Sequence, residues 1–136
     1  QVNPQLAALT LNRNATNLPI YDPQLIEEAM ETGRREGFYL QQGCYVARTG
    51  PNYETRSEYR MVRKIGGDVV GMSTVPEVLV AHALGMRILA LSAVTNVAKP
   101  DALIETTAAG VIDIAQLAEP KLHAIVMTVL DNINRE

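Results

Sequence analysis

What the chain lacks already limits what its 136 residues can do. With one cysteine, Cys44, it cannot form an internal disulfide, which favours a reducing compartment. It has no run of Lys and Arg, and its formal net charge of −3 argues against a surface for nucleic acid or for an anionic membrane. No apolar run approaches the roughly 20 residues of a membrane span, and no basic-then-apolar leader opens the sequence. We therefore expect a cytoplasmic protein that binds neither nucleic acid nor membrane.

Histidine and cysteine are also too scarce to suggest metal chemistry. Two His and one Cys offer no cluster of ligands, so no metal site is expected. Cys44 lies in a strand-like run without a nearby His, and we interpret it as core filling rather than as a nucleophile, since an activated thiolate needs an electropositive neighbour. His82 and His123 both fall inside predicted helices, and neither is assigned a role.

The composition that is present, 47% hydrophobic and 20% charged, supports one globular core in a chain too short for two ordinary domains. The hydrophobic pattern predicts helices separated by strands, without internal repeats, and hence an α/β fold with a mostly parallel or mixed sheet and helices on both faces. Residues 1–20 are interpreted as loop or weak structure. Helices are expected over 22–37, 55–65, 75–84 and about 107–134, the last perhaps interrupted at Pro120; strands are expected over 38–40 and 44–47 as a hairpin, and over 68–71 and 87–95.

The junction between the strand ending at Gly71 and the next helix is the most informative part of the chain. Residues 71–77 read Gly-Met-Ser-Thr-Val-Pro-Glu, where Thr74 and Glu77 form a capping-box pattern and the proline suits a first helical turn. Unpaired N–H groups and the positive helix end would face an anion, and Ser73 could add a hydrogen bond. A helix that is merely well capped is the alternative interpretation.

Two further motifs flank this junction. Upstream, residues 50–55 are Gly-Pro-Asn-Tyr-Glu-Thr; downstream, a buried-looking strand ends in Thr95-Asn96. Glu54, Met72 with Ser73, and Asn96 each follow or end a predicted strand. Because ligands of open α/β sheets bind outside the carboxyl ends of the strands, these motifs are expected to converge on one edge.

The order of these three motifs resembles the trimeric purine nucleoside phosphorylase and methylthioadenosine phosphorylase family. The resemblance is clear from about residue 21 to residue 96 and looser over the C-terminal helical region, so we divide the chain into a poorly matched segment 1–20 and a segment 21–136 that resembles the C-terminal half of the family's domain. Family members are about twice this long, and the fold is therefore expected to be phosphorylase-like but incomplete. The half without a counterpart carries the family's phosphate loop, its phosphate-binding Arg and His, and a ribose-contacting Tyr.

The resemblance implies a base-binding role for Glu54, Tyr53 and Val70 and a ribose contact for Met72. An ionised Glu54 accepts hydrogen bonds only, which fits a purine edge that carries an N–H group; alternatively it accepts from the start of the helix at Thr55. Tyr53 would stack on the base, or simply pack. Val70 would form an apolar wall, and Met72 an adaptable surface against the ribose unless it is only packed. Ser73 would bind phosphate.

Asn96 is the predicted catalytic residue. Glycosidic cleavage leaves negative charge on the purine. An amide N–H that donates a hydrogen bond to the purine both binds the base and stabilises this charge, so the hydrogen bond is stronger in the transition state than in the ground state. An Asx turn that closes the strand is the alternative role. Relatives that prefer 6-amino purines tend to carry Asp at this position, so Asn96 favours 6-oxopurines such as inosine and guanosine.

The implied activity is that of a purine nucleoside phosphorylase, with inorganic phosphate as co-substrate, no metal or organic cofactor, and a homotrimeric assembly. One departure concerns ribose, because the His that many relatives use is replaced here by Ala108. Activity of these residues alone is doubtful. A catalytically silent nucleoside-binding or oligomerisation module derived from the same fold stays open as the alternative.

Overall fold

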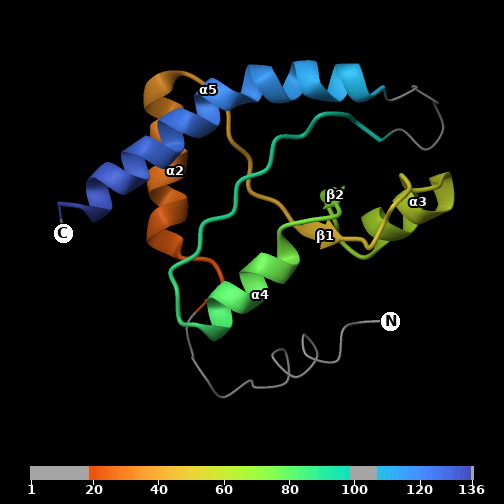
Figure 1. Cartoon of the computed structure of the whole chain (residues 1–136), viewed down its shortest axis with the longest axis horizontal. Coiled ribbons are helices and arrows are strands. Elements are labelled where there is room, and N and C mark those ends of the chain that lie inside the picture. The colour runs from red at the N-terminus through yellow and green to blue at the C-terminus, as the bar shows by residue number, and fades with distance from the viewer. Residues whose placement is uncertain (1–18, 99–106, 136) are drawn as a thin grey trace.

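The computed structural model describes residues 19–98 and 107–135 (Figure 1). In chain order its elements are α2 (Pro23–Glu36), β1 (Tyr45–Ala47), α3 (Arg56–Lys64), β2 (Val69–Gly71), α4 (Val75–Ala83) and α5 (Ala108–Ile133). The four helices occupy the predicted segments, and β1 and β2 lie within two of the predicted strands. Residues 1–20 are predicted to be loop or weak structure, and residues 1–18 of this segment lie outside the described residues.

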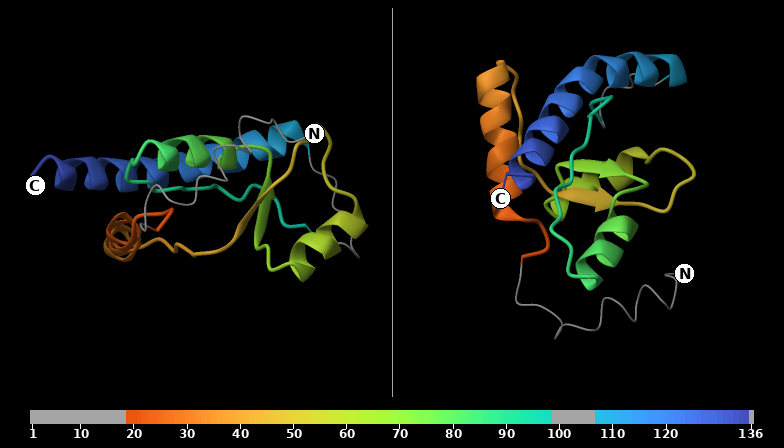
Figure 2. Two further views of the ribbon diagram at one scale, coloured as in Figure 1. Left: turned by 90° about the horizontal axis from the view of Figure 1, so that it is seen from below. Right: turned by 60° about the vertical axis from the view of Figure 1, so that its left-hand side comes forward.

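β1 and β2 form a parallel pair in which Val46 lies opposite Val70. Figure 1 shows this pair between α4 on one side and α3 on the other, and the right view of Figure 2 shows its two strands side by side. A parallel connection needs a crossover element, and α3 supplies it. The predicted α/β fold with parallel strands and helices on both faces is thus confirmed.

The main core forms where α2 crosses α5. Leu25 and Ala29 of α2 pack with Ile125 and Val129 of α5, and all four side chains are buried. Phe38, Leu40, Leu89 and Leu91 pack around this cluster from the extended segments. The i, i+4 spacing of each pair places both residues on one helix face, which is why the two helices meet along these positions.

The start of α2 is tied to the segment after α4. Asp22 caps α2, since its side chain accepts hydrogen bonds from the N–H groups of Gln24 and Leu25. The same carboxylate pairs with Arg87 at 2.5 Å, and the Asp22 backbone N–H donates to the carbonyl of Ile88. These contacts lower the pKa of Asp22, with the Arg87 hydrogen bond as the largest cause.

The predicted hairpin is wrong. Residues 38–40 form no strand in the described structure, and β1 pairs with β2 instead of with them. The Phe38 N–H donates to the Gly33 carbonyl and so closes the end of α2, while the Phe38 and Leu40 side chains pack on the core. The apolar residues of this segment therefore pack on the core, although their backbone pairs with no described strand.

The strand predicted over 87–95 is likewise absent: these residues, all described, are extended without ladder pairing. The predicted interruption at Pro120 does not end α5, which continues through the proline. The helix bends partway along its length (Figure 1), as expected when a proline removes a helical N–H donor. None of the described helices has the length and apolar character needed to cross a bilayer.

Candidate active site

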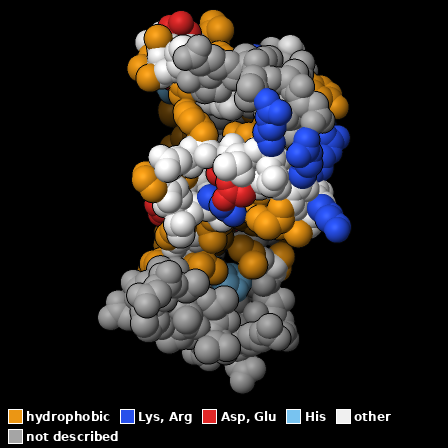
Figure 3. Space-filling view, turned by 90° about the vertical axis from the view of Figure 1, so that its right-hand side faces the viewer, with side chains coloured by type: hydrophobic (Ala, Val, Ile, Leu, Met, Phe, Trp, Pro, Cys, Tyr) orange, Lys and Arg blue, Asp and Glu red, His pale blue; other side chains and the backbone are white. Residues whose placement is uncertain are grey.

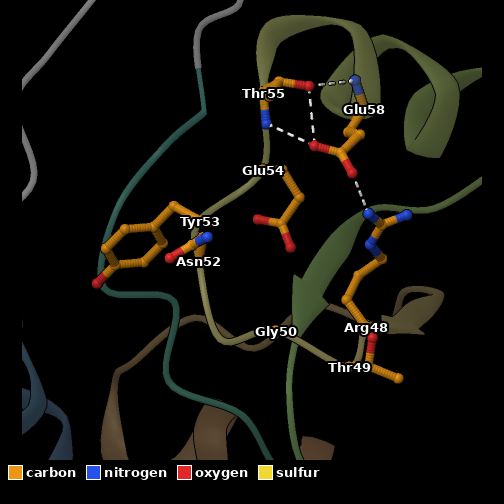
Figure 4. A pocket seen from close by; sticks show the side chains of 8 residues that line it. All are labelled: Arg48, Thr49, Gly50, Asn52, Tyr53, Glu54, Thr55 and Glu58. Carbon is orange, nitrogen blue, oxygen red and sulfur yellow. Dashed lines mark hydrogen bonds and ion pairs between the residues drawn. The ribbon is translucent and has the colours of Figure 1, made fainter.

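A small open cavity of about 230 Å³ lies between the end of β1 and the start of α3. Its lining is Arg48, Thr49, Gly50, Asn52, Tyr53, Glu54, Thr55 and Glu58. Figure 4 shows the Glu54 carboxylate in the middle of this ring of residues, whereas the Tyr53 ring extends to the other side of the loop. Two of the predicted base-binding residues, Tyr53 and Glu54, therefore lie at one cavity.

Glu54 is half-buried and has a neighbour that orients it. The pKa of Tyr59 is raised, first by burial, then by the negative charge of Glu54 and by a hydrogen bond between the two side chains. The Tyr59 hydroxyl is the donor in this bond, since an ionised carboxylate accepts only. The Glu54 carboxylate has further lone pairs, so it can also accept a hydrogen bond from a ligand N–H.

The start of α3 closes the opposite wall of the cavity. The Glu58 carboxylate accepts from both the Thr55 N–H and the Thr55 hydroxyl at 2.8 Å, and Thr55 in turn accepts from the Glu58 N–H, so the predicted capping box is confirmed. Arg48 forms an ion pair with the second oxygen of Glu58. The pKa of Glu58 is lowered, most by the Thr55 N–H hydrogen bond and then by the Thr55 hydroxyl, with Arg48 contributing less. Since these bonds occupy Glu58, Glu54 is the better placed of the two acids to receive a ligand.

Met72 touches the loop that lines the cavity. Gly50 has φ of +62°, and a Cβ added there would lie 2.5 Å from the Met72 Sδ atom. The positive φ favours glycine at this position, and a side chain there would also have to displace the Met72 thioether. The predicted ribose contact and the predicted base-binding loop are thus brought together, and the half-buried Val70 sits in β2 two residues before Met72.

The Ser73–Thr74 junction differs from its prediction. Thr74 makes no side-chain cap hydrogen bond, so the predicted capping box with Glu77 is wrong. Its φ of 74° and ψ of −58°, with a 2.8 Å bond from the Val75 N–H to the Ser73 carbonyl, define a γ-turn. A β-branched residue rarely adopts positive φ, and such strain clusters at functional sites. The proline in the first turn of α4 is confirmed.

Ser73 is exposed, and its backbone N–H lies 3.4 Å from the Tyr45 hydroxyl. That hydroxyl lies so close over Gly71 that a Cβ could not be added there. The Ser73 hydroxyl itself lies 3.4 Å from the Thr74 hydroxyl, at the surface. Tyr45 was missed by sequence reasoning, although its place opposite Val69 in the ladder brings it to this junction.

Asn96 does not line the cavity. It is exposed in the extended segment after α4, and its Oδ1 accepts a hydrogen bond from the Thr95 hydroxyl at 3.2 Å. Ala108 is the first residue of α5, directly after Thr107, which caps that helix by accepting from the Gly110 N–H. The structure thus joins the base-binding loop to Met72, and Asn96 is not among the residues that line the cavity.

Cys44 is exposed, and its interpretation as core filling is therefore wrong. Its backbone N–H donates to the Asp68 carboxylate at 2.8 Å, which holds the entry to β1 against the entry to β2. Within the described residues no group of three or more His, Cys, Asp and Glu is arranged to hold a metal ion.

Positive charge flanks the cavity on the outer face of α3. Figure 3 shows Lys and Arg side chains gathered on this face of the molecule, and the exposed basic residues of α3 are Arg56, Arg60, Arg63 and Lys64. A local positive field raises the concentration of anions near a site, even in a chain whose net charge is −3.

Comparisons with known proteins identify the family of the chain. Residues 10–131 match the model of the phosphorylase superfamily, and the chain belongs to this family. It is 46% identical over 95 residues to purine nucleoside phosphorylase 1 of Geobacillus stearothermophilus, covering 64% of the chain and 35% of that protein. It is 40% identical over 113 residues to purine nucleoside phosphorylase 1 of Bacillus subtilis, covering 83% of the chain and 36% of that protein.

A solved structure of similar fold is that of Schistosoma mansoni purine nucleoside phosphorylase in complex with inosine. It is 31% identical with a TM-score of 0.77, and the alignment covers 85% of this chain and 44% of that one. The chain thus spans less than half the length of the relatives named here.

Several residues of the site escaped sequence reasoning. Arg48 and Asn52 line the cavity, and Tyr59 binds Glu54, yet none was singled out. Arg48 carried a usable signal, because it directly follows a strand at the edge where ligands of parallel sheets bind. Tyr59 carried none, since its contact depends on how the loop before α3 folds back.

Proposed function

We propose that the protein to which these residues belong is a purine nucleoside phosphorylase that cleaves 6-oxopurine nucleosides, such as inosine and guanosine, with inorganic phosphate. The observation that carries the proposal is the Glu54 carboxylate in the middle of a cavity whose loop packs on Met72. Relatives named as purine nucleoside phosphorylases, together with a related structure containing inosine, support the substrate class.

In this reaction phosphate attacks the anomeric carbon of an oxocarbenium-like ribosyl group, and the purine leaves with the electrons of the glycosidic bond. Glu54 accepts from the purine N–H and holds the base in register. Val70 forms an apolar wall and Met72 lies against the ribose. Tyr53 stacks on the base after its ring turns from the other side of the loop (Figure 4). Asn96 donates to the charge that develops on the leaving base, and Ser73 donates to phosphate. Closure of the loop over a bound base would have to bring Asn96 to the cavity.

The assembly and location belong to the same proposal. A homotrimer would let a neighbouring subunit supply an aromatic side chain to the site, a cytoplasmic location fits a role in purine salvage, and neither a metal nor an organic cofactor takes part. One specific observation supports a second candidate, a silent nucleoside-binding or oligomerisation module. Ala108 carries no polar group to replace the ribose-contacting His of many relatives.

The assay for the proposal measures release of hypoxanthine from inosine, with and without phosphate, by the protein that carries these residues. We expect phosphate-dependent release that guanosine inhibits competitively. Glu54→Gln should raise KM for inosine, because an amide lacks the full acceptor capacity of a carboxylate; Glu31→Gln, an exposed acid on α2, serves as the control. Nucleoside binding without any release would favour the silent module, and hydrolysis without phosphate would contradict the proposed reaction.

A further inference from the structure

The loop that carries Glu54 is held at both ends by one carboxylate. Before the loop, Arg48 continues the ladder, since its backbone N–H donates to the Gly71 carbonyl at 2.8 Å, and its guanidinium pairs with Glu58 Oε1. After the loop, Thr55 donates twice to Glu58 Oε2 at 2.8 Å. Glu58 therefore clamps the end of β1 to the start of α3, with residues 49–54 spanning the gap (Figure 4).

The Arg48–Glu58 pair is more shielded than the arginine pairs on the surface of α2. Its side chains are 31% and 35% exposed, against 60% and 61% for the Arg34–Glu27 pair on α2. Exposed pairs contribute little because solvent and salt screen them, and screening weakens as exposure falls. The clamp is thus the stronger candidate for a contact with a measurable effect.

The loop itself has few internal restraints. Residues 49–54 form no helix or strand, and Gly50 sits at positive φ. The direction of Glu54 at the end of this loop therefore depends on how its two ends are fixed.

We infer that Arg48, acting through Glu58, is a positioning residue that fixes residues 49–54 so that Glu54 presents its carboxylate to a purine base. The inference deepens the proposed function and rests on it for the identity of the ligand. Arg48 touches no reacting atom in this account; it acts on affinity for the base rather than on the bond-breaking step.

The test is calorimetric titration of the protein with hypoxanthine. Arg48→Met keeps an unbranched apolar stem without the guanidinium and leaves the Thr55–Glu58 capping box intact, and we expect it to weaken binding about tenfold. Arg48→Lys should restore much of the affinity, because it restores the charge opposite Glu58. The matched control, Arg34→Met, breaks an arginine pair away from the cavity and should leave binding unchanged.

A double-mutant cycle separates positioning from a general loss of structure. If Arg48 acts through Glu54, adding Arg48→Met to Glu54→Gln should weaken hypoxanthine binding by less than twofold more. Full additivity of the two effects, or wild-type affinity in Arg48→Met, would overturn the inference.

Amide hydrogen exchange tests, without a ligand, whether the Arg48–Glu58 pair restrains the loop. In Arg48→Met, exchange should accelerate at residues 50–54, proline aside, while α2 is unaffected. If the wild type fails to bind hypoxanthine, the proposed function is contradicted, and the exchange result alone then decides the clamp. Unchanged exchange in the loop would refute it.

Discussion

A purine presents both a donor and an acceptor edge, and two side chains of this chain are suited to read them. Glu54, held by the Tyr59 hydroxyl, supplies a carboxylate that accepts only. Asn96 supplies an amide whose Oδ1 accepts from the Thr95 hydroxyl and whose NH₂ group is a donor. Substitution of Asn96, the donor, should lower turnover, because negative charge on the base develops only as the glycosidic bond breaks.

Asn96→Ala should lower inosine turnover by about 10²–10³, as loss of one preorganised donor to a developing charge does elsewhere. Asn96→Asp should shift preference toward 6-amino nucleosides, since a carboxylate accepts from an exocyclic amine. Steady-state kinetics with inosine and adenosine measure both effects. Asn134→Ala, at the exposed end of α5, is the control, and an alanine variant at position 96 with unchanged inosine turnover would remove Asn96 from the mechanism.

Elements whose start and stop signals are local were predictable from the sequence. Asp22-Pro23 predicted the start of α2, and Thr55 with Glu58 predicted the capping box of α3. The failures concern segments whose state depends on partners distant in sequence. Residues 87–95 have a strand's composition but find no ladder partner in the described structure. At Thr74 the pattern of a cap was present, but a γ-turn set by its surroundings turned the backbone out of capping geometry.

The same limit applies to the candidate site. The motif over residues 50–55 identified Glu54 and Tyr53 as site residues, because the residue types of a motif and their chemistry can be recognised from the sequence alone. Tyr59 could not be recognised from the sequence, since its contact with Glu54 depends on how the chain folds back around the cavity. Arg48 was recognisable only as a residue that directly follows a strand, and its pairing with Glu58 was not.

The α2 cap predicts a dependence of stability on pH. The pKa of Asp22 is lowered by Arg87 and by the hydrogen bonds of the cap. The ionised carboxylate therefore contributes fully to the free energy of unfolding above its ordinary pKa of about 3.9, and this contribution is lost as pH falls through the lower pKa of the folded state. Asp22→Asn keeps a capping oxygen but has no charge to lose. Denaturation between about pH 6 and pH 2 should therefore show a flatter acid limb for Asp22→Asn than for the wild type. Asp131→Asn, on the exposed face of α5, should keep the wild-type slope; equal slopes for all three proteins would contradict the assignment.

The loop glycine allows a test at the scale of an element. Gly50 and Gly37 both have positive φ, and alanine at either should cost about 1–2 kcal/mol of unfolding free energy. Only Gly50 faces Met72; Gly37 has nothing within 4 Å of an added Cβ. We therefore expect both variants to lose stability in urea denaturation, Gly50→Ala by more because of this contact, and only Gly50→Ala to bind inosine more weakly. Equal binding by the two variants would show that Met72 does not contribute.

On the scale of the whole molecule, many large apolar side chains lie at the surface. Leu84 and Leu117 are 72% and 73% exposed, and Tyr39 is 85% exposed. The relatives are more than twice as long as the part this chain matches. We expect some of this exposed apolar surface to be covered by another protein segment or subunit.

These 136 residues alone should therefore show no appreciable phosphorolysis, and they should either self-associate or require a further segment for a closed site. Light scattering of the purified chain, paired with the inosine assay, measures both properties. A monomer with turnover comparable to a full-length relative would contradict the expectation and would show that the site is complete without further chain.

The central claim, that the cavity beside Glu54 receives a 6-oxopurine, is tested most directly by a crystal structure of the protein soaked with hypoxanthine and phosphate. The account predicts the base N–H within hydrogen-bond distance of the Glu54 carboxylate, the Asn96 amide drawn to the opposite edge, and phosphate near the Ser73 hydroxyl. Hypoxanthine bound elsewhere, with Glu54 facing only protein, would contradict it.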